Sequence, residues 1–162
     1  MIVREVEERD LPALASLAQR TWVDAFADSV SAEDAAAELE QTRSEEYFRQ
    51  AMTNDTILVA ELDGALAGYV QFGDEVLDRL YVETALHRRG IGRALMEAAF
   101  AHPRLAEAPR VVLQVWEQNT GAIALYEAFG FRTVGRKAFS IGDEHVEDLL
   151  MEAVRPPGGW ER

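Results

Sequence analysis

The 162 residues are enough for one domain with a real core and too few for two ordinary ones. A net charge of −13 excludes the basic stripe that duplex nucleic acid requires, so no nucleic-acid partner is expected. The chain has no cysteine, which excludes disulfides, thiolate zinc sites and a cysteine nucleophile. The three histidines show no ligand spacing, so no metal site is expected. No apolar run is long enough for a bilayer and no signal-peptide pattern opens the chain, so we expect a cytoplasmic protein without a membrane partner.

The first half of the chain predicts one strand, two helices and three further strands. Helical spacing of apolar residues follows the first strand, and a capping pattern at Ser31 opens a second helix running toward Met52. Asp63-Gly64 predicts a hairpin between two β-rich segments. The expected strands are residues 2–6, 56–62, 65–72 and 76–82.

The second half alternates helices and strands. A helix must stop before Pro103, and the nearly unbroken apolar run 111–116 predicts a strand covered on both faces. Asn119 caps the next helix, which ends at Gly130 in the left-handed C′ position. A last pair of strands, 131–136 and 145–151, is joined through Gly142-Asp143. The domain is expected to span residues 1–154, with 155–162 as a flexible tail.

This order of elements predicts one α/β (α+β) domain of three layers. Its central mixed sheet, mostly antiparallel, should contain about seven strands flanked by four helices. The strands 76–82 and 111–116, separated by a helix, should pair in parallel.

Residues 87–94, His-Arg-Arg-Gly-Ile-Gly-Arg-Ala, are the most informative segment of the chain. They join a strand to a helix, where unpaired N–H groups and the helix dipole favour an anion. Gly90 and Gly92 let the backbone come close to a ligand, and the three arginines favour phosphate. The P-loop pattern is excluded because this segment contains no lysine. Leu95 stands where the dinucleotide fingerprint has its third glycine. An arginine-rich turn that only caps a helix is the alternative.

Two motifs together resemble those of the GNAT superfamily of acetyl-CoA-dependent N-acetyltransferases. Leu80-Tyr81-Val82 with residues 87–95 resembles the CoA-binding motif, and 111–116 with Asn119, Leu125-Tyr126 and Gly130-Phe131 resembles the second motif. The resemblance implies acetyl-CoA as co-substrate. His87 stands where the family usually has Gln or Arg, so the phosphate contacts there are expected mainly from backbone N–H groups.

The resemblance also implies which residues hold the cofactor. Backbone amides of Leu80, Tyr81 and Val82 would polarise the thioester carbonyl and pair with the pantetheine arm. Asn119 would donate to the cofactor or merely cap its helix. The expected phosphate-binding residues are His87, Arg88, Arg89, Gly90, Ile91, Gly92, Arg93 and Ala94.

Acetyl transfer requires a base that deprotonates the amine and an acid that assists the departing thiolate. The resemblance places Tyr126 near the CoA sulfur as the acid and cofactor contact; a packed core aromatic is the alternative. It places Asp78, ahead of the glycine loop, as the base. The rival carboxylates are Glu75, Glu83, Asp24 and Glu117.

The resemblance places the acceptor pocket at Trp22, Asp24 and Phe26, where aromatic and acidic side chains suit a cationic amine. Core packing is the alternative for the two aromatic residues. Segments 21–26, 115–119 and 139–144 resemble PaiA-type polyamine acetyltransferases, which favours a polyamine as the small-molecule amine. A protein amino group, an amino acid, a drug amine and a non-catalytic acyl-CoA sensor remain alternatives, and a homodimer is left open.

Overall fold

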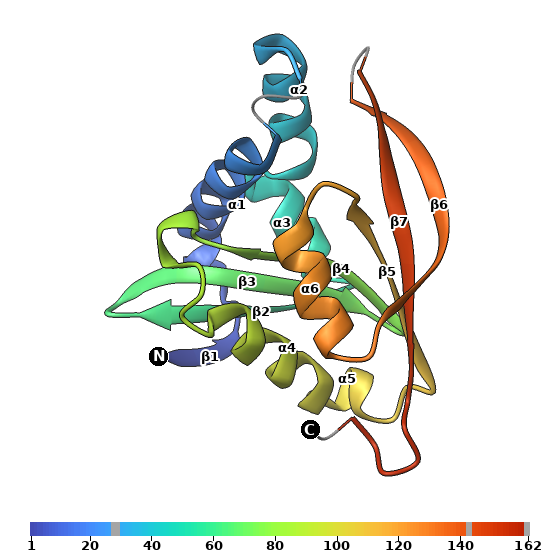
Figure 1. The fold of residues 1–162 in the computed structure, drawn as a ribbon. Coiled ribbons are helices and arrows are strands. Elements are labelled where there is room, and N and C mark those ends of the chain that lie inside the picture. Colours follow the sequence, from blue (N-terminus) through green and yellow to red (C-terminus); the bar gives the residue numbers. More distant parts are fainter. Residues whose placement is uncertain (27–29, 142–143, 161–162) are drawn as a thin grey trace.

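The computed structural model describes residues 1–26, 30–141 and 144–160, and its centre is one seven-stranded sheet (Figure 1). The strands lie in the order β1-β2-β3-β4-β5-β7-β6. This confirms the predicted seven-stranded mixed sheet. The strand bounds are β1 Ile2–Glu5, β2 Thr56–Leu62, β3 Ala65–Gly73, β4 Val76–Val82, β5 Arg110–Trp116, β6 Arg132–Ile141 and β7 Glu144–Val154.

The pairing of β4 with β5 is parallel, as predicted, and every other strand pair is antiparallel. The parallel β4–β5 ladder is very short. Val76 is opposite Val112 and Leu77 is opposite Leu113, and the ladder ends there. Beyond these residues β4 continues beside β3 and β5 continues beside β7. The sheet therefore divides in its middle and leaves a gap between its two halves.

The helices form a layer on each face of the sheet (Figure 1). Helices α4 and α6 pack on one face over a core that includes Val70 and Leu77, while α1 and α3 pack on the other over Val59 and Tyr69. The three-layer architecture is therefore confirmed. The helix bounds are α1 Leu11–Phe26, α2 Ala32–Thr42, α3 Glu45–Ala51, α4 Ile91–Ala101, α5 Pro103–Ala106 and α6 Thr120–Ala128, with 3₁₀ turns η1 Glu8–Asp10 and η2 Thr84–Leu86.

The prediction of four helices was wrong, because the segment after Ser31 forms two. Ser31 caps α2 by accepting a hydrogen bond from the Asp34 N–H, as predicted, but Ser44 accepts from the Tyr47 N–H and starts α3. Arg43, at the C-cap of α2, leaves the helical conformation with φ −142°. The short α5 begins at Pro103, where its missing N–H costs nothing.

The C-terminal segment returns to the core. The indole of Trp160 is 9% exposed, donates a hydrogen bond to the Leu105 carbonyl at 3.1 Å and packs 4.7 Å from the ring of Phe100. Within the segment expected as a flexible tail, Trp160 is buried, whereas Pro157 and Gly158 are exposed. Gly142-Asp143 of the expected β6–β7 hairpin and the last two residues lie outside the described ranges.

None of the helices in the described ranges combines the length and apolar character needed to cross a bilayer.

Candidate active site

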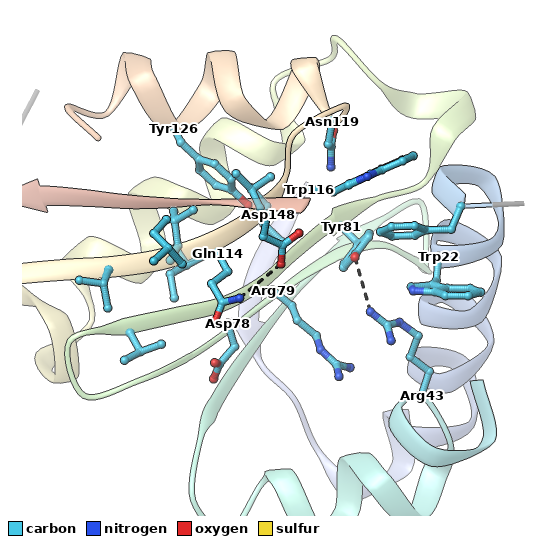
Figure 2. Close-up of a pocket in the computed structure, with 18 of the residues that line it drawn as sticks. Trp22, Arg43, Asp78, Arg79, Tyr81, Gln114, Trp116, Asn119, Tyr126 and Asp148 are labelled. Carbon is cyan, nitrogen blue, oxygen red and sulfur yellow. Dashed lines mark hydrogen bonds between the residues drawn. The ribbon is translucent and has the colours of Figure 1, made fainter. Parts of the chain in front are cut away.

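A cavity of about 590 Å³ lies where β4 and β5 diverge. Its walls include β4 from Val76 to Tyr81 and β5 from Val112 to Trp116. Residues on α1, α2, α6, β6 and β7 complete it (Figure 2). Because the β4–β5 ladder ends at Leu77, the later residues of β4 have no strand partner on this edge. Their backbone groups are available to a ligand that lies along the strand.

The three residues predicted to contact the cofactor through their backbone, Leu80, Tyr81 and Val82, lie on β4 beyond the end of the β4–β5 ladder. Leu80 and Tyr81 line the cavity, and Val82 packs toward α4. On their other edge the three residues pair with β3, opposite Val70, Tyr69 and Gly68. The strand is therefore anchored on one side only.

Tyr126 lines the cavity from α6, where it is buried near Tyr81 (Figure 2). Burial raises the pKa of its hydroxyl above the usual value, and the nearby Tyr81 contributes in the same direction. The phenol therefore stays protonated at and well above neutral pH. It also packs 5.9 Å from the Phe131 ring, so the core and site interpretations of Tyr126 are compatible.

Asp78 lines the same cavity and occupies a β-bulge. Arg79 is opposite Gln71 and Leu77 is opposite Phe72, which leaves Asp78 without a partner in β3. Its side chain keeps access to solvent, but partial burial and the nearby Asp55 carboxylate raise its pKa to about 6, against the smaller opposing effect of Arg79. A carboxylate with this pKa is a better base near neutral pH than an ordinary aspartate.

Three of the rival carboxylates lie outside the cavity wall. Glu83 pairs with Arg20 at 2.7 Å, and Glu117 pairs with Arg136 at 2.6 Å. Glu75 is in the turn before β4, with φ +60°. Of the carboxylates considered from the sequence, only Asp78 lines the cavity.

Two of the three residues expected in the acceptor pocket line the cavity, and the third does not. Trp22 and Phe26 line the cavity and stack in series with Trp116, at ring distances of 5.1 and 4.6 Å. Both are buried, so they pack in a small core and form a cavity wall at once. Asp24 is exposed, accepts a hydrogen bond from the Thr84 hydroxyl at 2.7 Å and does not line the cavity.

The glycine loop enters α4 through a left-handed turn. Gly90 is the N-cap with φ +80°, and Arg88 is also left-handed with φ +66°. The N–H groups of Arg88, Arg89 and Gly90 make no backbone hydrogen bond within the described ranges. Together with the unpaired N–H groups at the start of α4, they are free donors of the kind that suits phosphate oxygens.

The polar side chains of this loop differ in what they contact. Arg88 and Arg89 are exposed and have no partner in the part of the chain that the structure describes. Arg93 pairs with Glu97 at 3.1 Å. His87 is exposed and its Nε2 lies 3.0 Å from the Val82 carbonyl, so its ring contacts β4. Arg88 and Arg89 are therefore the loop cations free to meet an anion.

The remaining residues of the loop determine how the start of α4 packs against its neighbours. Ile91 is buried and Ala94 is half-buried on the inner face of α4. At Gly92 an added Cβ would lie 3.1 Å from a methyl of Leu125 on α6. Gly90 thus supplies the backbone conformation, whereas Gly92 permits the close packing of α4 against α6.

Asn119 caps its helix, as predicted. Its side-chain oxygen accepts a hydrogen bond from the Ala122 N–H at 3.3 Å and caps α6, and the residue also lines the cavity. The cap uses the carbonyl side of the amide. The NH₂ group has no partner among the described residues and is available as a donor.

Several polar residues of the cavity were missed in the sequence. Arg43, Arg79 and Glu38 line it, and so does Asp148 of β7, which accepts a hydrogen bond from Gln114 at 3.3 Å. Burial raises the pKa of Asp148 above its usual range. None of these residues belongs to a recognisable motif, because the fold brings them together from separate elements.

Residues 12–131 match the model of the acetyltransferase (GNAT) family. The match covers most of the chain and includes both motifs and the strands β2 to β5. The chain belongs to the acetyltransferase (GNAT) family. An uncharacterized N-acetyltransferase of Mycobacterium tuberculosis is 32% identical, over 88% of this chain and 96% of its own length.

Two further proteins extend the comparison. A spermine/spermidine N(1)-acetyltransferase of Bacillus subtilis is 30% identical over 100 residues, which cover 54% of this chain and 66% of that protein. The crystal structure of a PaiA N-acetyltransferase from Thermoplasma acidophilum in complex with coenzyme A superimposes with a TM-score of 0.81. It covers 94% of this chain and 98% of the other at 21% identity, which confirms the GNAT fold.

Proposed function

We propose that this GNAT protein transfers an acetyl group from acetyl-CoA directly to a primary amine. The observation that carries the proposal is the cavity between β4 and β5, whose lining includes both Tyr126 and Asp78. The fit of the donor rests on the glycine loop, whose free N–H groups and exposed Arg88 and Arg89 suit the pyrophosphate.

In this reaction the amine nitrogen attacks the thioester carbonyl carbon. Asp78 accepts the proton that the ammonium must lose, directly or through water, since an alkyl ammonium has a pKa of about 10. As the C–N bond forms, free N–H groups on the β4 edge stabilise the charge on the carbonyl oxygen. The C–S bond then breaks, the attacking nitrogen loses its second proton, and the departing thiolate takes up one proton through solvent, so that the amide and the CoA thiol are the products.

Tyr126 stabilises the departing thiolate with its hydroxyl. A thiol has a pKa of about 8.5, so thiolate is a tolerable leaving group that a hydrogen bond is enough to assist. Burial disfavours the phenolate at this position. We infer that Tyr126 mainly donates a hydrogen bond and that any proton it gives up is soon replaced.

Polyamines are one acceptor class for this proposal. The partial similarity to the Bacillus subtilis enzyme supports them, as do the carboxylates Asp78, Asp148 and Glu38 on the cavity wall. Two arginines on the same wall, Arg43 and Arg79, favour a different amine.

A thiol-release assay tests the proposal. Purified protein is incubated with acetyl-CoA and a panel of polyamines, amino acids, aminoglycosides and lysine peptides, and free CoA is measured. We expect amine-dependent release and intersecting initial-rate patterns, because the chain offers no cysteine for a covalent intermediate. Acetyl-CoA binding without release by any amine would instead support a sensor.

A further inference from the structure

Arg43 is a buried cation in the wall of the active-site cavity. It lies at the joint between α2 and α3, is 6% exposed, and its guanidinium is 5.6 Å from the ring centres of both Trp22 and Tyr81. Its Nη1 donates to the Thr42 hydroxyl at 2.7 Å, and its Nη2 is 3.5 Å from the Tyr81 hydroxyl. Its Nε is buried without a hydrogen-bond partner.

Arg79 brings a second cation to the same place from β4. Its guanidinium lies 4.5 Å from the ring centre of Tyr47 and donates to the Thr42 carbonyl at 2.7 Å. Because both arginines donate to Thr42, their guanidinium groups converge on one end of the cavity (Figure 2). Each keeps further N–H groups for a ligand.

Neither arginine has a carboxylate partner within 4.0 Å in the part of the chain that the structure describes. Several other arginines of this acidic protein form such pairs, for example Arg20 with Glu83 and Arg104 with Asp74. Two neighbouring cations, one of them buried, repel each other and lose hydration when no anion compensates them. A bound anion would remove this cost.

We propose that the acceptor is an amine that also carries a carboxylate. This inference rests on the proposed acetyl transfer and names its substrate class. The carboxylate binds Arg43 and Arg79, whose planar guanidinium groups suit a bidentate pair, and the amino group lies toward Asp78. The cavity thus presents a positive end and a negative end to a zwitterionic molecule.

A polyamine fits this charge pattern less well. One of its cationic groups can meet Asp78, but the others would face two guanidinium groups that already lack a counter-ion. The negative net charge of the protein attracts any cation to its surface. Selection inside the cavity depends on the local charges instead.

The test compares matched acceptors in the thiol-release assay with acetyl-CoA. Pairs with and without the carboxylate are leucine and leucinamide, β-alanine and ethylamine, and 6-aminohexanoate and hexylamine, with spermidine as a further acceptor. We expect at least one carboxylated amine to exceed its partner at least 10-fold in kcat/KM. It should also exceed spermidine.

Two variants assign that preference to the arginines. Arg79→Gln should reduce the ratio of kcat/KM between the paired acceptors at least 10-fold, mainly through a higher KM for the carboxylated one. Arg43→Lys keeps the buried charge but loses the planar fork, and should reduce the same ratio. Arg9→Gln is the matched control, because Arg9 is an exposed arginine paired with Glu7, and the ratio should not change.

The outcomes separate the two proposals. If spermidine or the carboxylate-free amines are the better acceptors, the carboxylate inference is wrong while acetyl transfer stands. The carboxylate inference would also be overturned if Arg79→Gln and Arg9→Gln, both with wild-type melting temperatures, had the same ratio of kcat/KM between the paired acceptors. If no amine releases CoA, the proposed acetyl transfer itself fails.

Discussion

The carboxyl groups of Asp78 and Asp55 lie close enough for the charge of one to oppose ionisation of the other. Asp55 is held from the other side by the Gln71 amide, which donates to it at 2.9 Å. Partial burial and this repulsion together raise the pKa of Asp78 to about 6. The proposed base therefore has a pKa suited to catalysis near neutral pH. A substitution at Asp55, which lies outside the cavity wall, should change that pKa.

The pH dependence of kcat/KM should show this coupling. A base works only when deprotonated, so activity should fall as the pH drops below about 6. Asp55→Asn removes the opposing charge while keeping an oxygen that accepts from Gln71. It should lower the pKa of Asp78 and move the acidic limb to lower pH. Asp78→Asn should reduce kcat/KM about 100-fold. An unchanged acidic limb in Asp78→Asn would show that another group is the base.

Removal of the Tyr126 hydroxyl should affect chemistry more than binding. We expect Tyr126→Phe to lower kcat about 10- to 100-fold, because the thiolate loses a hydrogen bond in a desolvated site. The Kd for acetyl-CoA, measured by calorimetry, should change less than threefold. Tyr69→Phe is the control: it removes another buried hydroxyl, one that interacts with Arg79 and does not line the cavity, and should leave kcat near wild type. Equal kcat values for the two variants would contradict the assignment.

The glycine loop offers a prediction with a closely matched control. Gly90 and Gly64 have φ of +80° and +82°, and an added Cβ would meet nothing within 4 Å at either position. An alanine should therefore cost about 1–2 kcal/mol of stability at both. Only Gly90→Ala should also disturb the free N–H groups, and we expect its Kd for acetyl-CoA to rise at least 10-fold. Similar Kd values in the two variants would argue against phosphate binding by this loop.

The C-terminal segment should stabilise the fold without taking part in the reaction. Trp160→Ala removes a buried indole and its hydrogen bond to Leu105, and should lower the free energy of unfolding by about 3 kcal/mol. Val154→Ala, at a side chain that is 61% exposed, should change it by less than about 0.5 kcal/mol. Urea unfolding of the two variants compares these costs. Equal stabilities would mean that the segment is not packed in solution.

The sequence was most informative where the determinants are local. The capping by Ser31, the Asp63-Gly64 hairpin and the left-handed Gly130 each depend on a few adjacent residues, and the structure confirms them. The parallel pairing of β4 and β5 follows from the crossover helix between them.

The remaining features depend on contacts between distant segments. Arg43 enters the cavity at the joint where α2 ends and Ser44 starts α3, and no motif contains it. The sequence could not choose Asp78 among the candidate bases. The structure favours it because the other candidates are paired or lie outside the cavity. Trp160 follows two prolines and two glycines, a composition typical of a free tail, yet it packs beside Phe100.

The most direct test of the account is a calorimetric titration of acetyl-CoA into the purified protein. The account predicts a saturable heat for one site per chain, and a Kd that rises with salt because phosphate contacts with Arg88 and Arg89 contribute to binding. Absence of any heat with acetyl-CoA and with CoA would contradict it, because both the loop and the cavity would then lack the ligand on which the proposed chemistry depends.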